Sequence, residues 1–190
     1  LKLIKKKIDC DKMAESIADA LKVGMNVKLN MIMGFPHETK RHIFETVKFL
    51  KKMALLGVHD VNITCFSPYP GSELYNELRQ TGEIKEMDTD YFLMLTGYSD
   101  LRFSYSYSPH FSDRQLTMYR LGGWFMFYII SFLSHPTRVF GLLRNLVQGK
   151  QESRLDVALQ GLVNRFRRKR TRLQDEDFAV GVGATQKQLG

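Results

Sequence analysis

The sequence has 190 residues, 44% of them hydrophobic, which is enough for one ordinary domain with a buried core and excludes wholesale disorder. Lys and Arg outnumber Asp and Glu by 28 to 20, mainly through 5–7 and 165–172, and such clusters suit either phosphate groups or solvated helix ends. The two cysteines, Cys10 and Cys65, are too few for a disulfide framework or a four-thiolate metal site, which favours a reducing, cytoplasmic setting.

The start of the chain and its apolar runs bear on targeting. The first residue is Leu1 rather than Met, and no charged leader with an apolar centre precedes the first predicted element, so we expect a cut sequence. A membrane span needs about 20 apolar residues, whereas the strongest run, 124–130, is much shorter. The sequence therefore predicts no transmembrane helix.

The first two predicted elements are a helix and a strand. The helix covers 9–21, with Asp9 or Asp11 as its cap. The strand is mostly apolar, covers 26–33 and ends in a Gly-Phe-Pro turn, which is typical of a buried strand and its exit.

A second helix, a second strand and a third helix follow. The second helix begins near Thr39 and ends at Gly57, the strand covers 61–66, and Ser72 caps a helix that ends at Gln80. Strands separated by such a helix pair in parallel. Two parallel strands with apolar faces leave an unpaired edge, so we expect further strands from elsewhere.

The remaining sequence is predicted to be largely helical. The segment 83–109 is interpreted as irregular, either covering a barrel mouth or carrying one more strand around 100–105. A capping box at 112–115 opens a helix that runs to about Leu133.

Two further helices begin near Pro136 and at Ser153, and a disordered tail is expected from Thr171. The apolar face of the Pro136 helix is predicted to comprise Val139, Leu142, Leu143, Leu146 and Val147, with Arg138, Arg144 and Asn145 elsewhere.

Two motifs occur in order with one predicted helix between them. The segment 30–39 reads NMIMGFPHET, and the segment 67–75 reads SPYPGSELY. Together they resemble the fifth and sixth strand regions of radical S-adenosylmethionine enzymes, most closely the cobalamin-domain subclass that includes anaerobic magnesium-protoporphyrin IX monomethyl ester cyclases. A Gly-x-Pro turn is common by itself, so the resemblance depends on the pair.

The resemblance implies an α/β fold, namely the C-terminal part of a partial (β/α)6 TIM-like barrel followed by an α-helical tail. It assigns residues 1–110 to the C-terminal half of the radical S-adenosylmethionine core, with strands five and six and their flanking helices. A helical extension would cover 111–170 and a disordered tail 171–190.

In parallel barrels, ligands lie beyond the carboxyl ends of the strands. By resemblance, the residues that would border the S-adenosylmethionine site are Ile32, Gly34, Glu38, Phe66 and Ser67. Gly34 would permit close backbone approach. Glu38 matches the acidic position of the family motif, and it equally suits the first turn of a helix, where it would complement the dipole.

Four apolar strand residues have two interpretations. Leu29, Met31, Val61 and Ile63 could line a water-excluding cavity for radical chemistry, or they could be ordinary core residues. No residue is identified as catalytic.

The pattern CxxxCxxC, with which the family ligates its [4Fe-4S] cluster, is absent, as is any cobalamin module. The chain is therefore predicted to be an inactive C-terminal fragment with no metal site of its own. The resemblance implies that the complete enzyme uses the cluster to cleave S-adenosylmethionine to a 5′-deoxyadenosyl radical, which abstracts hydrogen from a substrate. A cobalamin cofactor would come with a missing N-terminal domain. Cys10 and Cys65 are interpreted as small, buried or half-buried hydrophobes.

An alternative function is a membrane-surface or partner-binding helical module without catalysis, because 124–132 is rich in aromatic residues and the later helices are basic and amphipathic. Such helices more often cover a barrel or a neighbouring domain, so peripheral membrane contact is not the favoured interpretation. The basic run lacks interleaved aromatics, and no nucleic-acid partner is expected. The expected partners are a small-molecule substrate and the missing N-terminal half of the same protein.

Overall fold

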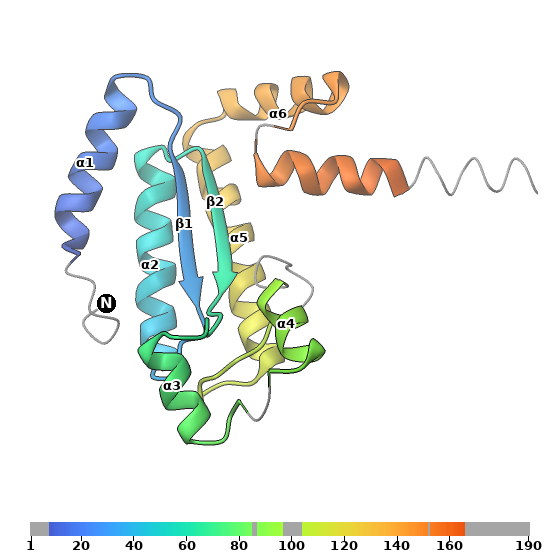
Figure 1. Cartoon of the computed structure of the whole chain (residues 1–190). Helices are drawn as coiled ribbons and strands as arrows, with labels where there is room; N and C mark the ends of the chain where they lie inside the picture. The colour runs from blue at the N-terminus through green and yellow to red at the C-terminus, as the bar shows by residue number, and fades with distance from the viewer. Residues whose placement is uncertain (1–7, 85–86, 97–103, 152, 166–190) are drawn as a thin grey trace, which may run out of the picture. The chain divides into compact units, whose positions relative to one another are not determined.

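The structure, a computed structural model, describes residues 8–84, 87–96, 104–151 and 153–165. The chain divides into two compact units, Leu1–Thr137 and Arg138–Gly190. Within the described residues it is mixed α/β and mostly helical, with one two-stranded sheet, which confirms the predicted α/β class (Figure 1).

The first helix, α1, spans Cys10–Lys22 and confirms the helix predicted from its capping signals. The side chain of Asp9 accepts hydrogen bonds from the backbone N–H groups of Asp11 and Lys12, at 2.9 and 3.2 Å. Asp9 is therefore the N-cap, because these bonds satisfy donors that the first helical turn leaves open.

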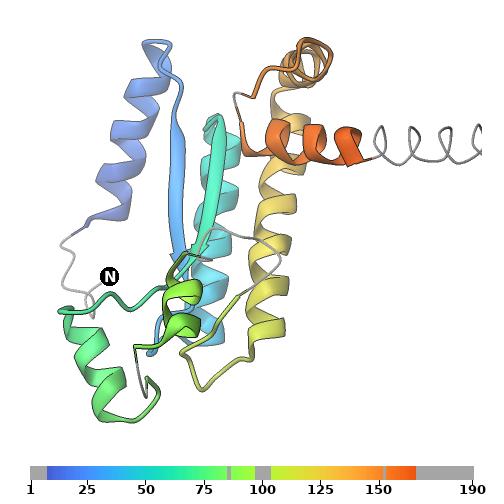
Figure 2. The same ribbon diagram turned by 45° about the vertical axis from the view of Figure 1, so that its right-hand side comes forward.

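The sheet consists of β1, Lys28–Met33, and β2, Asp60–Cys65. The two strands pair in parallel, as predicted, with Met31 opposite Ile63 and Ile32 opposite Thr64. The crossover between them is the helix α2, Lys40–Leu56, which lies against the same side of both strands in both views (Figures 1 and 2).

Local signals define the ends of α2 and of the next helix, α3, Glu73–Gln80. Thr39 caps α2, and Gly57 ends it with a φ of 105°, a left-handed conformation that glycine adopts without steric cost. Ser72 caps α3 by accepting a hydrogen bond from the N–H of Tyr75. These features confirm the predicted helix boundaries.

Side chains of the two strands alternate between the helical layer and the opposite face, because a strand has a period of two. A side chain built at Gly123 would lie 3.3 Å from Cδ1 of Ile63 and 4.0 Å from Cε of Met33, so these two residues face the helices. Val61 is fully buried and Ile63 is 1% exposed. For Val61 and Ile63, the structure therefore supports the second interpretation, that they are ordinary core residues.

A short helix, α4, spans Thr89–Thr96, within the segment that the sequence analysis treats as irregular. That prediction is wrong at this place, and the missed signal is Asp88, whose carboxylate accepts a hydrogen bond of 2.8 Å from the N–H of Tyr91. A strand was also expected around 100–105. Most of that range lies within 97–103, which are outside the described residues.

The longest helix, α5, spans Asp113–Ser134 and confirms the predicted helix and its capping box. The Ser112 hydroxyl accepts from the N–H of Gln115 at 3.4 Å, and the Gln115 side chain accepts from the N–H of Ser112 at 3.0 Å. By length and composition α5 is the one described helix that could cross a membrane, but core helices pass the same test and 39% of its most apolar window is buried. The predicted absence of a transmembrane helix stays a prediction.

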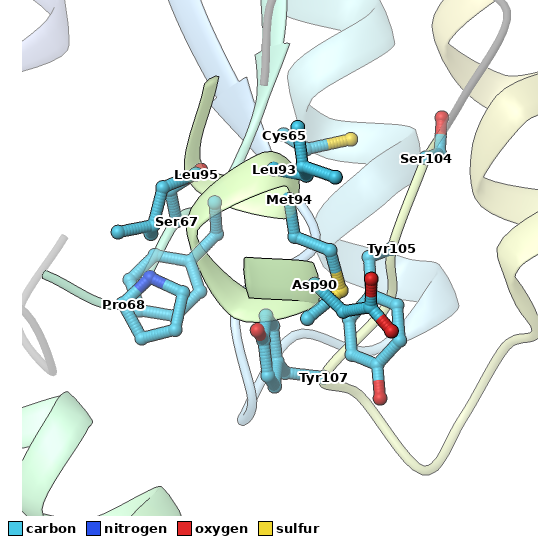
Figure 3. A pocket seen from close by; sticks show the side chains of 11 residues that line it. Cys65, Ser67, Pro68, Asp90, Leu93, Met94, Leu95, Ser104, Tyr105 and Tyr107 are labelled. Atoms are coloured by element: carbon cyan, nitrogen blue, oxygen red, sulfur yellow. The ribbon is translucent and has the colours of Figure 1, made fainter. Parts of the chain in front are cut away.

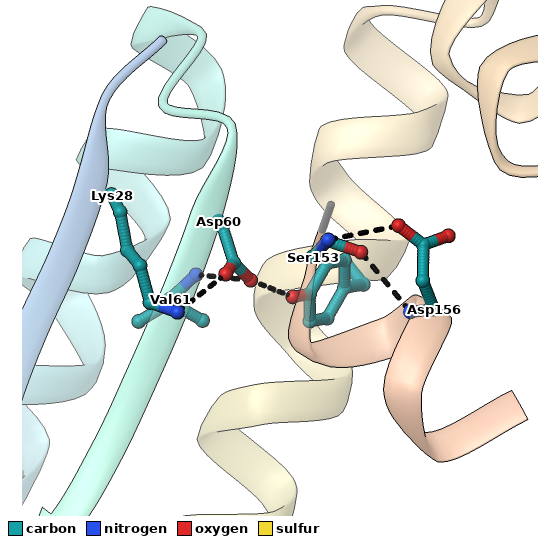
Figure 4. A network of polar contacts seen from close by, with 6 residues as sticks. Lys28, Asp60, Val61, Ser153 and Asp156 are labelled. Carbon is teal, nitrogen blue, oxygen red and sulfur yellow. Dashed lines mark hydrogen bonds and ion pairs between the residues drawn. The ribbon is translucent and has the colours of Figure 1, made fainter. Parts of the chain in front are cut away.

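Polar contacts hold α5 against β2. Arg120, fully buried, donates from Nε and Nη2 to the carbonyl oxygen of Ile63, at 3.2 and 2.9 Å. Near the start of β2, the buried Asp60 accepts a hydrogen bond from the hydroxyl of Tyr128 and forms an ion pair of 3.0 Å with Lys28 (Figure 4). These contacts fix which face of α5 is turned to the sheet.

In the second unit, α6 spans Thr137–Gln148, and a further helix covers 154–165. The predicted phase of α6 is wrong at Asn145, which is 5% exposed, and at Leu143 and Val147, which are 53 and 88% exposed. Asn145 is buried because its Nδ2 donates to Asp156 (3.3 Å), a residue of the following helix. Ser153 caps that helix as predicted, through reciprocal bonds with Asp156 (Figure 4). The tail expected from Thr171 lies outside the described residues.

Candidate functional site

The turn after β1 is closed by a buried carboxylate. Oε2 of Glu38 accepts hydrogen bonds from the backbone N–H groups of Gly34 and Phe35, at 2.5 and 3.3 Å, and Glu38 is 8% exposed. Burial raises the pKa of Glu38 above its ordinary value, and the two amide donors oppose that rise. Glu38 precedes the cap Thr39, so its main bonds go to the turn rather than to the first turn of α2.

Gly34 has a structural reason to be glycine. Its φ is 92°, and a side chain built there would place Cβ 2.8 Å from Cδ2 of Leu116, a fully buried residue of α5. The close packing of Leu116 against Gly34 is therefore enough to require a glycine at this position. The close approach of a ligand to the same backbone, which the resemblance implies, would be a second reason.

The exit of β2 packs directly against this turn. The N–H of Phe66 donates to the carbonyl of Met33 at 2.7 Å, which extends the strand pairing by one residue. The ring of Phe66 lies 4.8 Å from that of Phe35 and 5.8 Å from that of Tyr107, centroid to centroid. The carboxyl ends of both strands are thus joined by backbone and aromatic contacts.

A cavity of about 470 Å³ opens beside the exit of β2 (Figure 3). Its walls are mainly apolar and come from the end of β2, from α4 and from 104–107. Phe66 and Ser67, both predicted site residues, line it. Burial raises the pKa of Tyr107, another lining residue, and the neighbouring Tyr105 raises it further.

A second cavity, of about 740 Å³, lies along β1. It is lined by residues of α1, β1 and α2, and it includes the predicted site residues Ile32 and Glu38 together with Leu29 and Met31. The predicted residues are therefore divided between two cavities. Phe35 lines this cavity and Phe66 lines the other, so their two rings, tilted by 36° to each other, lie at the boundary between the two cavities.

The face of the sheet away from the helices carries Ile32, a predicted site residue, together with three polar residues that were not predicted to belong to the site. Alternation places Asn30, Ile32, Asn62 and Thr64 on this face. Ile32 is 44% exposed, and the Thr64 hydroxyl donates to the carbonyl of Met31 at 3.1 Å. The period-two pattern could have identified this polar face, since it separates these positions from Val61 and Ile63.

The described residues contain no group of three or more His, Cys, Asp or Glu side chains that could hold a metal ion. Cys65 is buried, as expected, but Cys10 is exposed, so the prediction for Cys10 is wrong. Cys10 is the first residue of α1, where the helix turns its side chain to solvent. Two cysteines in these positions do not fit a [4Fe-4S] cluster.

Comparison with known proteins gives one short similarity. A protein of Pyrococcus horikoshii named as an uncharacterized methyltransferase is 33% identical over 75 residues. The match covers 40% of this chain and spans only 16% of the length of that protein. A scan of the chain against models of protein families finds no match.

Proposed function

We propose that this chain is the C-terminal part of a radical S-adenosylmethionine enzyme, in which β1 and β2 are the last two strands of a partial (β/α)6 barrel. The observation that carries the proposal is the joined pair of strand ends. The Gly34 turn and the Phe66 exit lie side by side at the carboxyl edge of a parallel sheet, where α/β barrels place their ligands.

The small size of the sheet supports the proposal that β1 and β2 belong to a larger barrel. Within the described residues, β1 pairs with β2 and with no other strand. Two parallel strands with helices on one face are an unusual complete sheet, because the outer edge of β1 and the part of the other face that carries Asn30 and Ile32 stay open. Further strands added at β1 would enclose the polar face that carries Asn30 and Asn62.

The side chains at this edge support S-adenosylmethionine as the proposed ligand. Ile32 is 44% exposed on the open face, and Phe66 and Ser67 line the neighbouring cavity. Because Ile32 and Phe66 line different cavities, we propose that the adenine lies at the boundary between the two cavities and contacts both side chains, while Gly34 and Glu38 hold the turn that positions Ile32. The methyltransferase name of the Pyrococcus protein is in keeping with such a cosubstrate, since S-adenosylmethionine is a common methyl donor.

The iron–sulfur cluster is a different case. The chain has two cysteines and the described part offers no metal-binding group, so no residue here is assigned to the cluster. The cluster ligands are proposed to lie in polypeptide upstream of Leu1. The same upstream segment would carry any cobalamin module.

The test uses the complete polypeptide, obtained by following the reading frame upstream of Leu1 in the source genome. We expect this frame to encode CxxxCxxC. After anaerobic reconstitution with iron and sulfide and reduction with dithionite, the protein should convert S-adenosylmethionine to 5′-deoxyadenosine and methionine, measured by liquid chromatography. An upstream frame without the three cysteines, or a reconstituted protein that forms no 5′-deoxyadenosine, would reject the proposal.

A matched pair of variants tests the assigned contact. Ile32→Arg places a charge on the open face and should raise the KM for S-adenosylmethionine about tenfold, which corresponds to about 1.4 kcal/mol. Val23→Arg introduces the same side chain at a residue that is 74% exposed beyond the end of α1, and it should leave the KM unchanged. Equal KM values for the two variants would remove Ile32 from the site.

A further inference from the structure

Helix α4 is anchored in the core and presents apolar side chains to the cavity beside the exit of β2. Tyr91 is 2% exposed and belongs to a buried cluster with Tyr75. Its hydroxyl donates a hydrogen bond of 2.5 Å to the carbonyl of Pro68. Leu93 and Met94, which are 61 and 37% exposed, line the cavity (Figure 3). The core contacts of Tyr91 therefore hold an apolar wall in place.

A second wall of the cavity, within 104–107, is held by hydrogen bonds near both of its ends. Nη1 of Arg120 donates to the hydroxyl of Ser104 at 2.8 Å. The hydroxyl of Ser108 donates to the backbone carbonyl of Glu38 at 2.6 Å. Both walls are thus fixed by contacts within the chain, and most small-molecule sites are pre-formed in this way.

The size and lining of the cavity indicate an apolar ligand with a ring. Its volume of about 470 Å³ lies within the range of about 300–1,000 Å³ that is usual for small-molecule sites. Three aromatic rings line it, and that of Tyr107 lies 5.8 Å from Phe66 and 4.8 Å from Tyr105, centroid to centroid. The other apolar lining residues are Cys65, Pro68, Leu93, Met94 and Leu95. A flat ring can pack against the faces and edges of the three aromatic side chains.

One acidic side chain gives the cavity its polarity. Among the described lining residues, Asp90 is the single charged one, and it is exposed in the first turn of α4. A carboxylate beside apolar walls attracts a cation or an N–H donor and repels an anion. The chain as a whole carries a net charge of +8, which attracts anions instead. A preference for a cationic ligand would therefore come from Asp90 and not from the overall charge.

We propose that this cavity binds the substrate, and that the substrate is an apolar, ring-containing amine whose nitrogen lies near Asp90. The word substrate rests on the proposed function, because the cavity adjoins the boundary at which the adenine is proposed to lie. Phe66 would then contact both molecules, since it lines the cavity and stands at that boundary. The preference of the cavity for such an amine does not depend on the radical chemistry.

The test is displacement of the fluorescent probe N-phenyl-1-naphthylamine, which is apolar, aromatic and neutral, from the full 190-residue chain. The competitors are 1-naphthylmethylamine and 1-naphthoate, which share a ring system and carry opposite charges at neutral pH. We expect saturable binding of the probe. The amine should displace it with an inhibition constant at least about tenfold lower than that of the carboxylate, because only the amine is attracted by Asp90.

Two pairs of variants assign the binding to this cavity. Met94→Arg should weaken probe binding about tenfold or more, because a long charged side chain enters the apolar space. Phe92→Arg, on the same helix at a residue that is 50% exposed and outside the lining, should bind like the parent chain. Asp90→Asn should reduce the preference for the amine to about twofold or less, whereas Asp19→Asn, at an exposed acid of α1, should keep it. Circular dichroism checks that each variant keeps the fold.

Three results would overturn the proposal. The first is a probe that does not bind saturably, or that binds Met94→Arg and Phe92→Arg equally well. The second is a carboxylate that displaces the probe as well as the amine does. The third is a preference for the amine that survives Asp90→Asn, because Asp90 would then serve only the helix dipole. None of these results bears on the formation of 5′-deoxyadenosine by the complete polypeptide, so the two proposals fail separately.

Discussion

Arg120 of α5 is fully buried and donates two hydrogen bonds to the backbone carbonyl oxygen of Ile63 in the middle of β2. Its Nη1 also donates to the hydroxyl of Ser104 at 2.8 Å. The pair joins a helix and a strand that are far apart in the sequence, and it sets which face of α5 is covered. The burial of one face of α5 and the exposure of the opposite face both depend on this contact.

Replacing Arg120 should therefore be costly. Arg120→Met is expected to lower the free energy of unfolding by about 3 kcal/mol, because it leaves a buried carbonyl without its charged donor. Arg120→Lys should recover less than half of this loss, since an ammonium group lacks the planar fork. Urea denaturation followed by the fluorescence of Trp124, the single tryptophan, measures the effect. Arg114→Met is the control at an exposed position, and equal stability of Arg114→Met and Arg120→Met would contradict the assignment.

Gly34 and Gly71 separate steric crowding from backbone strain. Both have positive φ, 92° and 88°, but a side chain at Gly71 would meet nothing within 4 Å. Gly71→Ala should cost about 1–2 kcal/mol from backbone strain alone, and Gly34→Ala should cost about 1–3 kcal/mol more because its Cβ meets Leu116. In a double-mutant cycle with Leu116→Ala, the combined loss of stability should be smaller than the sum. Equal losses at the two glycines would show that α5 does not crowd Gly34.

Glu38 should make stability depend on pH. Its pKa is raised above the ordinary value of 4.5, chiefly by burial, so its stabilising contribution is complete below the unfolded-state pKa and is lost as pH rises through the raised folded-state pKa. Glu38→Gln keeps an acceptor oxygen for the amides of Gly34 and Phe35 and removes the charge. Relative to Glu38→Gln, the parent protein should therefore lose stability as pH rises from 4.5 toward neutrality.

The control for Glu38 is Glu15→Gln, at an exposed position of α1. Urea midpoints measured across this pH range should show no such difference for Glu15→Gln. A Glu38→Gln curve parallel to that of the parent protein would mean that burial does not act on this carboxyl group.

Replacement of two adjacent glycines of α5 by alanine should change the free energy of unfolding in opposite directions. Gly122 meets nothing within 4 Å, so Gly122→Ala should raise the free energy of unfolding by about 0.5–1 kcal/mol through helix propensity. Gly123→Ala should gain the same propensity but force apart Leu50 and Ile63, at a cost of about 1–3 kcal/mol. Thermal denaturation should therefore give a higher Tm for the first variant and a lower one for the second. The reverse order of the two Tm values would mean that Gly123 does not face the sheet.

Much of the secondary structure followed from short-range chemistry. Asp9, Thr39, Ser72 and Ser112 cap the helices that their sequence positions predicted, because a side-chain acceptor acts on backbone donors within one turn. The parallel pairing was also predictable, since a helix of α2's length between two buried strands has few other arrangements. The helix α4 was missed because its aromatic and apolar residues show no clear stripe.

The sequence by itself determined the helix ends, the strand–helix–strand unit and the residues around the Gly34 turn, because each depends on neighbours within a few positions. Only the tertiary structure decided that Leu116 crowds Gly34, that Asn145 is buried through Asp156, and that Ile32 and Phe66 line different cavities. The choice of which face of α5 is exposed was also decided by the tertiary structure. Periodicity marks an apolar helix face, but which face is covered depends on contacts such as Arg120 to Ile63, which join residues that no local pattern relates.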